Sequence, residues 1–191
     1  MIDLGTKKLI LASQSPRRKE LLRGLGIEFE VRTKDTNEDF PENLDSSEVA
    51  GFLSEKKAAA FAQEIGPDEI IITSDTVVIL DGKILGKPAD KEDAFEMLSR
   101  LSGKTHLVTT AITFLSIGKK ITFSDTAKVH FKELSKLEID FYISTFKPFD
   151  KAGAYGIQEW IGFVGVEKIE GSYFTVMGLP IHLVYDVLKK W

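Results

Sequence analysis

The chain has 191 residues, of which 43% are hydrophobic, and it contains no cysteine. This length is sufficient for one globular domain with its own core, and we expect a single domain over residues 1–191. The lack of cysteine excludes disulfides, thiolate metal sites and cysteine nucleophiles. The formal net charge of −4 argues against binding to a nucleic-acid polymer, which usually requires a basic face.

The start of the chain shows no signal-peptide pattern, because no basic segment precedes an apolar run of the required length and Asp3 lies near the first residue. The longest apolar run, near Ile70 to Leu80, is interrupted by Ser74 and Asp75. It is also shorter than the roughly 18 residues that a membrane span needs. We therefore expect a cytoplasmic protein that does not associate with a membrane.

The first half of the chain alternates apolar runs with helical segments. Lys8–Ala12 predicts a short buried strand. A helix is expected from Pro16 to about Gly24, because Ser15 suits the N-cap and proline suits the first helical position. A strand, a long helix, a second strand and a hairpin are then predicted: Phe29–Thr33, Ser46–Glu64, Ile70–Leu80, and the turn Asp81-Gly82 leading into Lys83–Leu85.

The second half predicts helices around two long antiparallel strands. The expected elements are a helix, two strands joined at Gly118, a helix, a strand within a glycine-rich stretch and a closing helix: Lys91–Leu101, Thr105–Ser116, Lys120–Phe131, Lys136–Ser144, Phe163–Ile169 within Phe149–Gly171, and Pro180–Lys189. This order of elements predicts an α/β fold with a mixed β-sheet rather than a purely parallel one.

The helix that begins at Pro16 carries three cations in its first turn, Arg17, Arg18 and Lys19. A helix N-terminus has partial positive charge and favours acidic residues there, so these cations destabilise the helix by a few tenths of a kcal/mol each. An anion bound to the helix N-terminus would account for them, and arginine is suited to phosphate oxygens. The alternative is ordinary solvated surface charge, screened by Glu20.

The segment from Leu11 to Leu22 resembles the opening signature of the Maf family of nucleotide pyrophosphatases. Further segments match that family in the same order along the chain: Glu55-Lys56-Lys57-Ala58, Ser74-Asp75-Thr76-Val77, Gly86-Lys87-Pro88, Asp150–Gln158, Gly171-Ser172-Tyr173 and Gly178-Leu179-Pro180. The resemblance implies a Maf/ITPase-like fold, with an elongated mixed β-sheet, flanking helices and a cleft between two lobes. It also implies a homodimer.

The reaction implied by the resemblance converts a nucleoside triphosphate and water into the monophosphate and pyrophosphate. Arg18, Lys57 and Lys87 are the candidate phosphate clamps, and Ser13 and Ser15 would help to bind the substrate. Arg18 is supported by the helix argument, whereas Lys57 and Lys87 rest on the resemblance, because exposed lysine is common on helices and at hairpin ends. The catalytic set is then Asp75, Lys57 and Lys87.

Asp75 interrupts an apolar strand, where a buried carboxylate is unfavourable unless it is paired or metal-bound. A metal ligand, a general base, both together, and a structural aspartate stay open, and the resemblance favours the proton acceptor. Glu38 is the second candidate metal ligand, with the adjacent Asp39 as the alternative. Oxygen ligands without a histidine or cysteine cluster indicate Mg²⁺ or Mn²⁺.

Three positions resemble those that separate the family by substrate: Arg17, Thr76 and Gln158. They match the dTTP/UTP branch rather than the 7-methyl-GTP branch. A primary amide offers both donors and an acceptor, so Gln158 suits the N3–H and carbonyl edge of uracil or thymine. Glu159 departs from the pattern, since the family commonly has glycine there.

Two other functions stay open at this point. One is a nucleotide-binding regulator of cell division or septum formation with little turnover. The other is a pyrophosphatase of the 7-methyl-GTP type. Arg18, Lys57, Asp75 and Lys87 together favour an enzyme, because binding alone does not require an aspartate within a strand.

Overall fold

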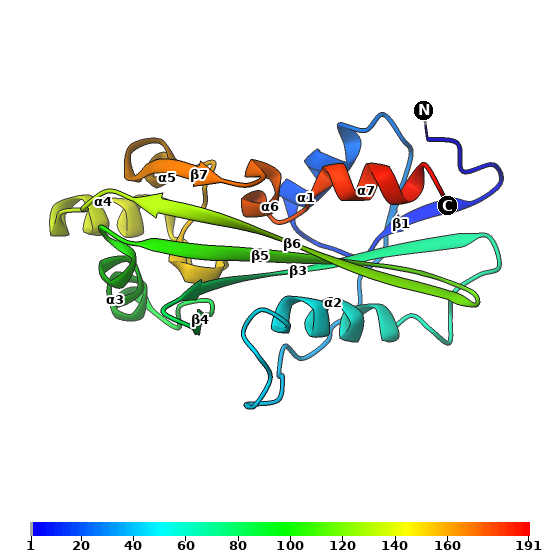
Figure 1. Ribbon diagram of the computed structural model, residues 1–191, viewed down its shortest axis with the longest axis horizontal. Helices are drawn as coiled ribbons and strands as arrows, with labels where there is room; N and C mark the ends of the chain where they lie inside the picture. Colours follow the sequence, from blue (N-terminus) through cyan, green and yellow to red (C-terminus); the bar gives the residue numbers. More distant parts are fainter. Residues whose placement is uncertain (1) are drawn as a thin grey trace. The chain divides into compact units, whose positions relative to one another are not determined.

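The computed structural model describes residues 2–191, which form helices around a mixed β-sheet (Figure 1). In this part of the chain the strands are β1 (Lys8–Leu11), β2 (Glu30–Val31), β3 (Glu69–Leu80), β4 (Lys83–Leu85), β5 (Thr105–Ser116), β6 (Lys119–Phe131) and β7 (Val166–Glu170). The helices are α1 (Pro16–Arg23), α2 (Val49–Ala59), α3 (Lys91–Leu101), α4 (Lys136–Phe146), the 3₁₀ helix η1 (Ala152–Ala154), α5 (Trp160–Gly165), α6 (Tyr173–Met177) and α7 (Ile181–Leu188). No helix in this range is long and apolar enough to cross a bilayer.

The strands follow the order β2-β1-β3-β5-β6-β7, and β4 pairs with β3 beside this path. β1 is parallel to both β2 and β3, whereas the β3–β4 and β6–β7 pairs are antiparallel. The predicted mixed sheet is therefore confirmed.

The chain divides into two compact units. The first contains the residues up to Asp75 together with Thr110–Asp125 and Gly178–Trp191, and the second contains Thr76–Thr109 and Thr126–Met177. Strands β3, β5 and β6 each contribute residues to both units.

In the first unit, helices cover both faces of the sheet: α1 and α7 on one face and α2 on the other (Figure 1). Successive strand residues point to opposite faces, so Leu9 and Leu11 belong to one core cluster and Ile10 to another. The first cluster includes Leu22 of α1, and the second includes Phe61, just after α2. The apolar runs of β1 and β3 are thus explained by burial on both faces.

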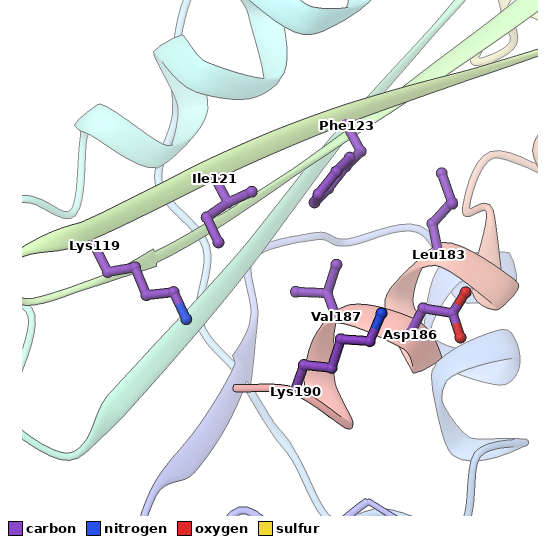
Figure 2. Close-up of a pocket in the computed structure, with 7 residues that line it drawn as sticks. All are labelled: Lys119, Ile121, Phe123, Leu183, Asp186, Val187 and Lys190. Carbon is purple, nitrogen blue, oxygen red and sulfur yellow. The ribbon is translucent and has the colours of Figure 1, made fainter.

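An open groove lies between β6 and α7 in the first unit (Figure 2). Its lining consists of Lys119, Ile121, Phe123, Leu183, Asp186, Val187 and Lys190. None of these residues belongs to the candidate site.

The core of the second unit contains a group of rings formed by His106, Phe131 and Tyr155. Their centroids lie 5.0 to 5.4 Å apart in edge-to-face arrangements, and His106 Nε2 is 2.8 Å from the Tyr155 hydroxyl. Burial, aided by the charge of His130, lowers the pKa of His106 to about 4, so the ring is neutral at pH 7.

The strand predicted for Phe163–Ile169 is partly wrong, because Trp160–Gly165 forms helix α5 and strand β7 begins only at Val166. Ile161 and Gly165 are the buried residues of α5, and their spacing of four is helical. Phe163 lies between them and is exposed. The short helix α6 was not predicted, and the long helix predicted from Ser46 is shorter, over Val49–Ala59.

Gly153 tests how tightly the second unit is packed. Its φ is +66°, and an added Cβ would lie 3.0 Å from Val78 Cγ1. We expect Gly153→Ala to lower the free energy of unfolding by roughly 2 to 4 kcal/mol, through backbone strain and overpacking. Gly118→Ala is the matched control, since φ there is +75° with nothing within 4 Å. Urea unfolding should show a clearly smaller loss for the control, and equal losses would contradict the packing argument.

Candidate functional site

Two serine hydroxyls hold the backbone of the loop after β1 through hydrogen bonds. Ser13 is buried, and its Oγ accepts a hydrogen bond of 3.2 Å from the backbone N–H of Ser15. The Oγ of Ser15 in turn accepts one of 3.5 Å from the N–H of Arg18, and Pro16 begins the helix. The predicted N-cap and first helical residue are therefore confirmed, and both serines hold the local backbone.

Arg18 binds two backbone carbonyls at the point where β1 stops accompanying β3. The last β1–β3 bond runs from the Ala12 N–H to the Ile72 carbonyl, at 2.8 Å. Arg18 Nη1 donates to the next outward carbonyl on that edge, Ser74 O, at 2.8 Å, and its Nε donates to Gly178 O at 2.7 Å. The guanidinium thus replaces the missing strand. Burial lowers its pKa, but an arginine side chain stays protonated in proteins.

Asp75, Lys57 and Glu38 form a charged cluster in the first unit. The Lys57 ammonium donates to Asp75 Oδ1 and to Glu38 Oε1, the latter at 2.9 Å. The Asp75 side chain is only 9% exposed, and that of Glu38 is 45% exposed. The structure therefore brings together three of the predicted residues and satisfies the buried carboxylate through a lysine.

The alternation of β3 explains why Asp75 meets α2. Thr73, two residues before it, lies on the same face and bonds to Ser54 of α2 at 2.7 Å through its hydroxyl. Lys57 stands three residues after Ser54, on the same side of the helix. The Ser74 side chain points to the opposite face of the sheet, and its hydroxyl donates to Gly178 O at 3.1 Å.

The loop between β2 and α2 reaches the cluster through two consecutive lysines. Lys56 Nζ donates to the backbone carbonyl of Asp39 at 2.8 Å, while Lys57 binds the carboxylate of Glu38. Of the two alternatives for the second ligand, this geometry favours Glu38, because its carboxylate shares a cation with Asp75.

The same arrangement fits a divalent cation. One ammonium contacts an oxygen of each carboxylate, so the two side chains already converge on a single positive charge. In the described part of the chain, no three histidine or acidic side chains are grouped so as to hold a metal ion. Mg²⁺ suits such a site, because it commonly binds one or two carboxylates and takes its other ligands from water and substrate phosphates.

Four other predicted residues lie on four different segments. Thr76 follows Asp75 in β3, Lys87 follows β4, and Gln158 precedes α5; all three belong to the second unit, whereas Arg17 belongs to the first. Within the second unit, the N–H of Gly153 donates to the carbonyl of Gly86 at 2.9 Å. This bond joins the segment of Lys87 to the one that leads to Gln158.

Sequence reasoning did not assign a role to the carbonyls of Ser74 and Gly178. Both residues stand in segments that match the family, but a carbonyl contact leaves no side-chain signature. The resemblance was the only signal pointing to these positions.

The chain is similar to known proteins over almost its full length. The family model described as Maf-like protein matches residues 8–191. The dTTP/UTP pyrophosphatase of Phocaeicola vulgatus is 54% identical over 189 residues, covering 98% of each chain. That of Porphyromonas gingivalis is 49% identical over 195 residues, covering 100% of this chain and 98% of its own. Among solved structures, the Staphylococcus aureus Ham1 protein matches 65% of this chain and 72% of its own, with a TM-score of 0.49 and 14% identity.

Arg18→Lys tests the structural part of the arginine's role. A lysine ammonium carries its donors on a single atom and cannot reproduce the separate positions of Nε and Nη1, so at least one of the two hydrogen bonds to Ser74 O and Gly178 O should be lost. We expect the free energy of unfolding to fall by about 1 to 3 kcal/mol in chemical denaturation. Arg17→Lys, one residue away, should stay within about 0.5 kcal/mol of the wild type. Similar losses in both variants would contradict the anchoring role of Arg18.

Proposed function

This chain belongs to the Maf-like protein family, and we propose that it hydrolyses dTTP and UTP to the nucleoside monophosphate and pyrophosphate. The observation that carries the proposal is the buried Asp75 carboxylate, which Lys57 links to Glu38. The full-length relatives named dTTP/UTP pyrophosphatase support the substrate class. We further propose that the protein is cytoplasmic, that it consists of a single domain and that it forms a homodimer. It should bind neither a nucleic-acid polymer nor a membrane.

In the proposed reaction, a water oxygen forms a bond to the α-phosphorus. The bond from that phosphorus to the bridging oxygen breaks, and pyrophosphate leaves with the electron pair. Asp75 accepts the proton of the attacking water, a transfer that contributes typically 10²- to 10⁴-fold in enzymes. Lys57 and Lys87 stabilise the negative charge that grows on the leaving group, and Arg18 binds the phosphates together with Ser13 and Ser15.

Asp75 and Glu38 are the residues that would hold a divalent metal, Mg²⁺ or Mn²⁺. When bound, the ion neutralises the triphosphate and polarises its oxygens. The Lys57 ammonium orients both carboxylates before the ion arrives, because each accepts a charge-assisted hydrogen bond.

The proposed base selection depends on Gln158, with Arg17 and Thr76 as the other contributors. The Gln158 side chain is half-buried, and it makes no hydrogen bond within residues 2–191. Its amide is therefore available to pair with the N3–H and a carbonyl of uracil or thymine.

Asp75→Asn tests the chemistry. Asparagine cannot accept the proton, so we expect pyrophosphate release from dTTP and UTP with Mg²⁺ to fall by about 10²-fold or more. Asp39→Asn is the control, because its side chain lies outside the Lys57 cluster, and it should keep most of the activity. Circular dichroism checks that both variants are folded. Binding of UTP by the wild type without turnover would support a regulatory protein instead.

Gln158→Glu tests base selection. A carboxylate lacks the donors that pair with uracil carbonyls and repels them, so kcat/KM for UTP should fall about 10- to 100-fold. Because the side chain is half-buried and unpaired, the unfolding free energy should change by less than about 0.5 kcal/mol. The exposed Gln63 provides the control Gln63→Glu, which should leave both quantities unchanged. A wild-type preference for 7-methyl-GTP, or equal losses of stability and activity, would overturn the assignment.

A further inference from the structure

The segment that carries Gln158 is closed by an ion pair between its ends. Lys151 Nζ lies 3.1 Å from Glu159 Oε1 and 2.7 Å from Asp150 Oδ1. The Lys151 side chain is only 8% exposed, whereas that of Asp150 is 70% exposed. Glu159 is therefore the partner that accompanies Lys151 into the interior, and the pair joins residues that are eight positions apart.

Tyr142 of α4 fastens the same segment from the inside. Its hydroxyl donates to Glu159 Oε2 and accepts a hydrogen bond of 3.0 Å from the N–H of Gly156. The side chain is fully buried and stacks on Phe146, with ring centroids 5.3 Å apart. Burial and the Glu159 carboxylate raise the pKa of Tyr142, so the hydroxyl keeps its proton and donates.

The carboxylate of Glu159 lies directly against Gly156. A Cβ added at Gly156 would be 2.8 Å from Glu159 Cδ, closer than any side chain tolerates. Both oxygens of Glu159 are engaged, one by Lys151 and one by Tyr142. The carboxylate is thus part of the internal support of the segment, and this distinguishes it from the neighbouring Gln158 amide.

Glu159 has an extended backbone, with φ −97° and ψ 176°. Gln158 itself lies in a turn, which the N–H of Glu159 closes by donating to the carbonyl of Gly156 at 3.0 Å. Holding the Glu159 carboxylate on Tyr142 and Lys151 therefore fixes one end of the turn that carries Gln158, which is a half-exposed residue.

We propose that Glu159, held by Tyr142 and Lys151, is a positioning residue that presents the Gln158 amide to the pyrimidine base in one orientation. This inference rests on the proposed function. An amide that can rotate or shift pairs less selectively, because both donor and acceptor must meet the base edge at once. The network acts through Gln158, so its loss should alter base selection and not the hydrolytic step.

Tyr142→Phe removes both hydroxyl bonds while keeping the ring. We expect KM for UTP to rise about tenfold, the loss of about one well-placed hydrogen bond, with kcat within about threefold of the wild type. The ratio of kcat/KM for UTP to that for GTP should fall by a similar factor. Hydrogen exchange measured by mass spectrometry should become faster over residues 151–159. Tyr185→Phe is the matched control, because no hydrogen bond is made by the Tyr185 hydroxyl in the described chain, and it should change none of these readouts.

Glu159→Gln and Glu159→Ala give a second test. Glutamine can still accept from Tyr142 but loses the charge that pairs with Lys151, so it should retain more UTP selectivity than alanine. Unchanged selectivity in Tyr142→Phe and Glu159→Ala, with only a lower melting temperature, would overturn the positioning role. Lack of UTP hydrolysis by the wild type would instead refute the proposed function. In that case hydrogen exchange still tests whether Tyr142 holds the segment. Unchanged exchange over residues 151–159 in Tyr142→Phe would refute the network as well.

Discussion

The buried carboxylate of Asp75 is the constraint on which the first unit depends. An ionised group within an apolar strand is unfavourable unless a partner of opposite charge accompanies it. Lys57 provides that partner, so α2 must cover this face of β3 in one register. Since Lys57 also binds Glu38, the same charge orders the loop before α2. Removing the lysine would leave a buried negative charge, which is more damaging than replacing both partners together.

A second constraint acts on Ser74, the residue of β3 that precedes Asp75. β1 ends before β3 does, so β1 offers no partner to the buried carbonyl of Ser74. Arg18 fills that place and binds Gly178 as well, so α1, β3 and the start of the closing segment are tied at one point. The charged side chains of the candidate site are therefore also the ones that hold the first unit in shape.

The predictable parts are those with a local signal. The apolar run and length of β3, and the cap at Ser15, follow from the sequence, and Asp75 stands out because it breaks that run. The partners of these residues have no such signal. A lysine on a helix is exposed by default, so Lys57 gains its role only from packing. The choice of Glu38 over Asp39 depends on how one loop folds, and α5 is too short for its helical period to outweigh its apolar composition.

The three cations in the first turn of α1 can now be interpreted more closely. Their unfavourable position relative to the helix dipole was the first indication of an anion, yet Arg18 has carbonyl partners that offset this cost without any ligand. The unfavourable position of cations relative to the helix dipole therefore indicates a bound anion mainly through Arg17 and Lys19. Arg18 keeps a proposed role at the phosphates for a different reason. A guanidinium fixed by two carbonyls loses little further freedom when it binds an anion, so the anchor that completes the sheet edge would also preorganise the proposed phosphate clamp.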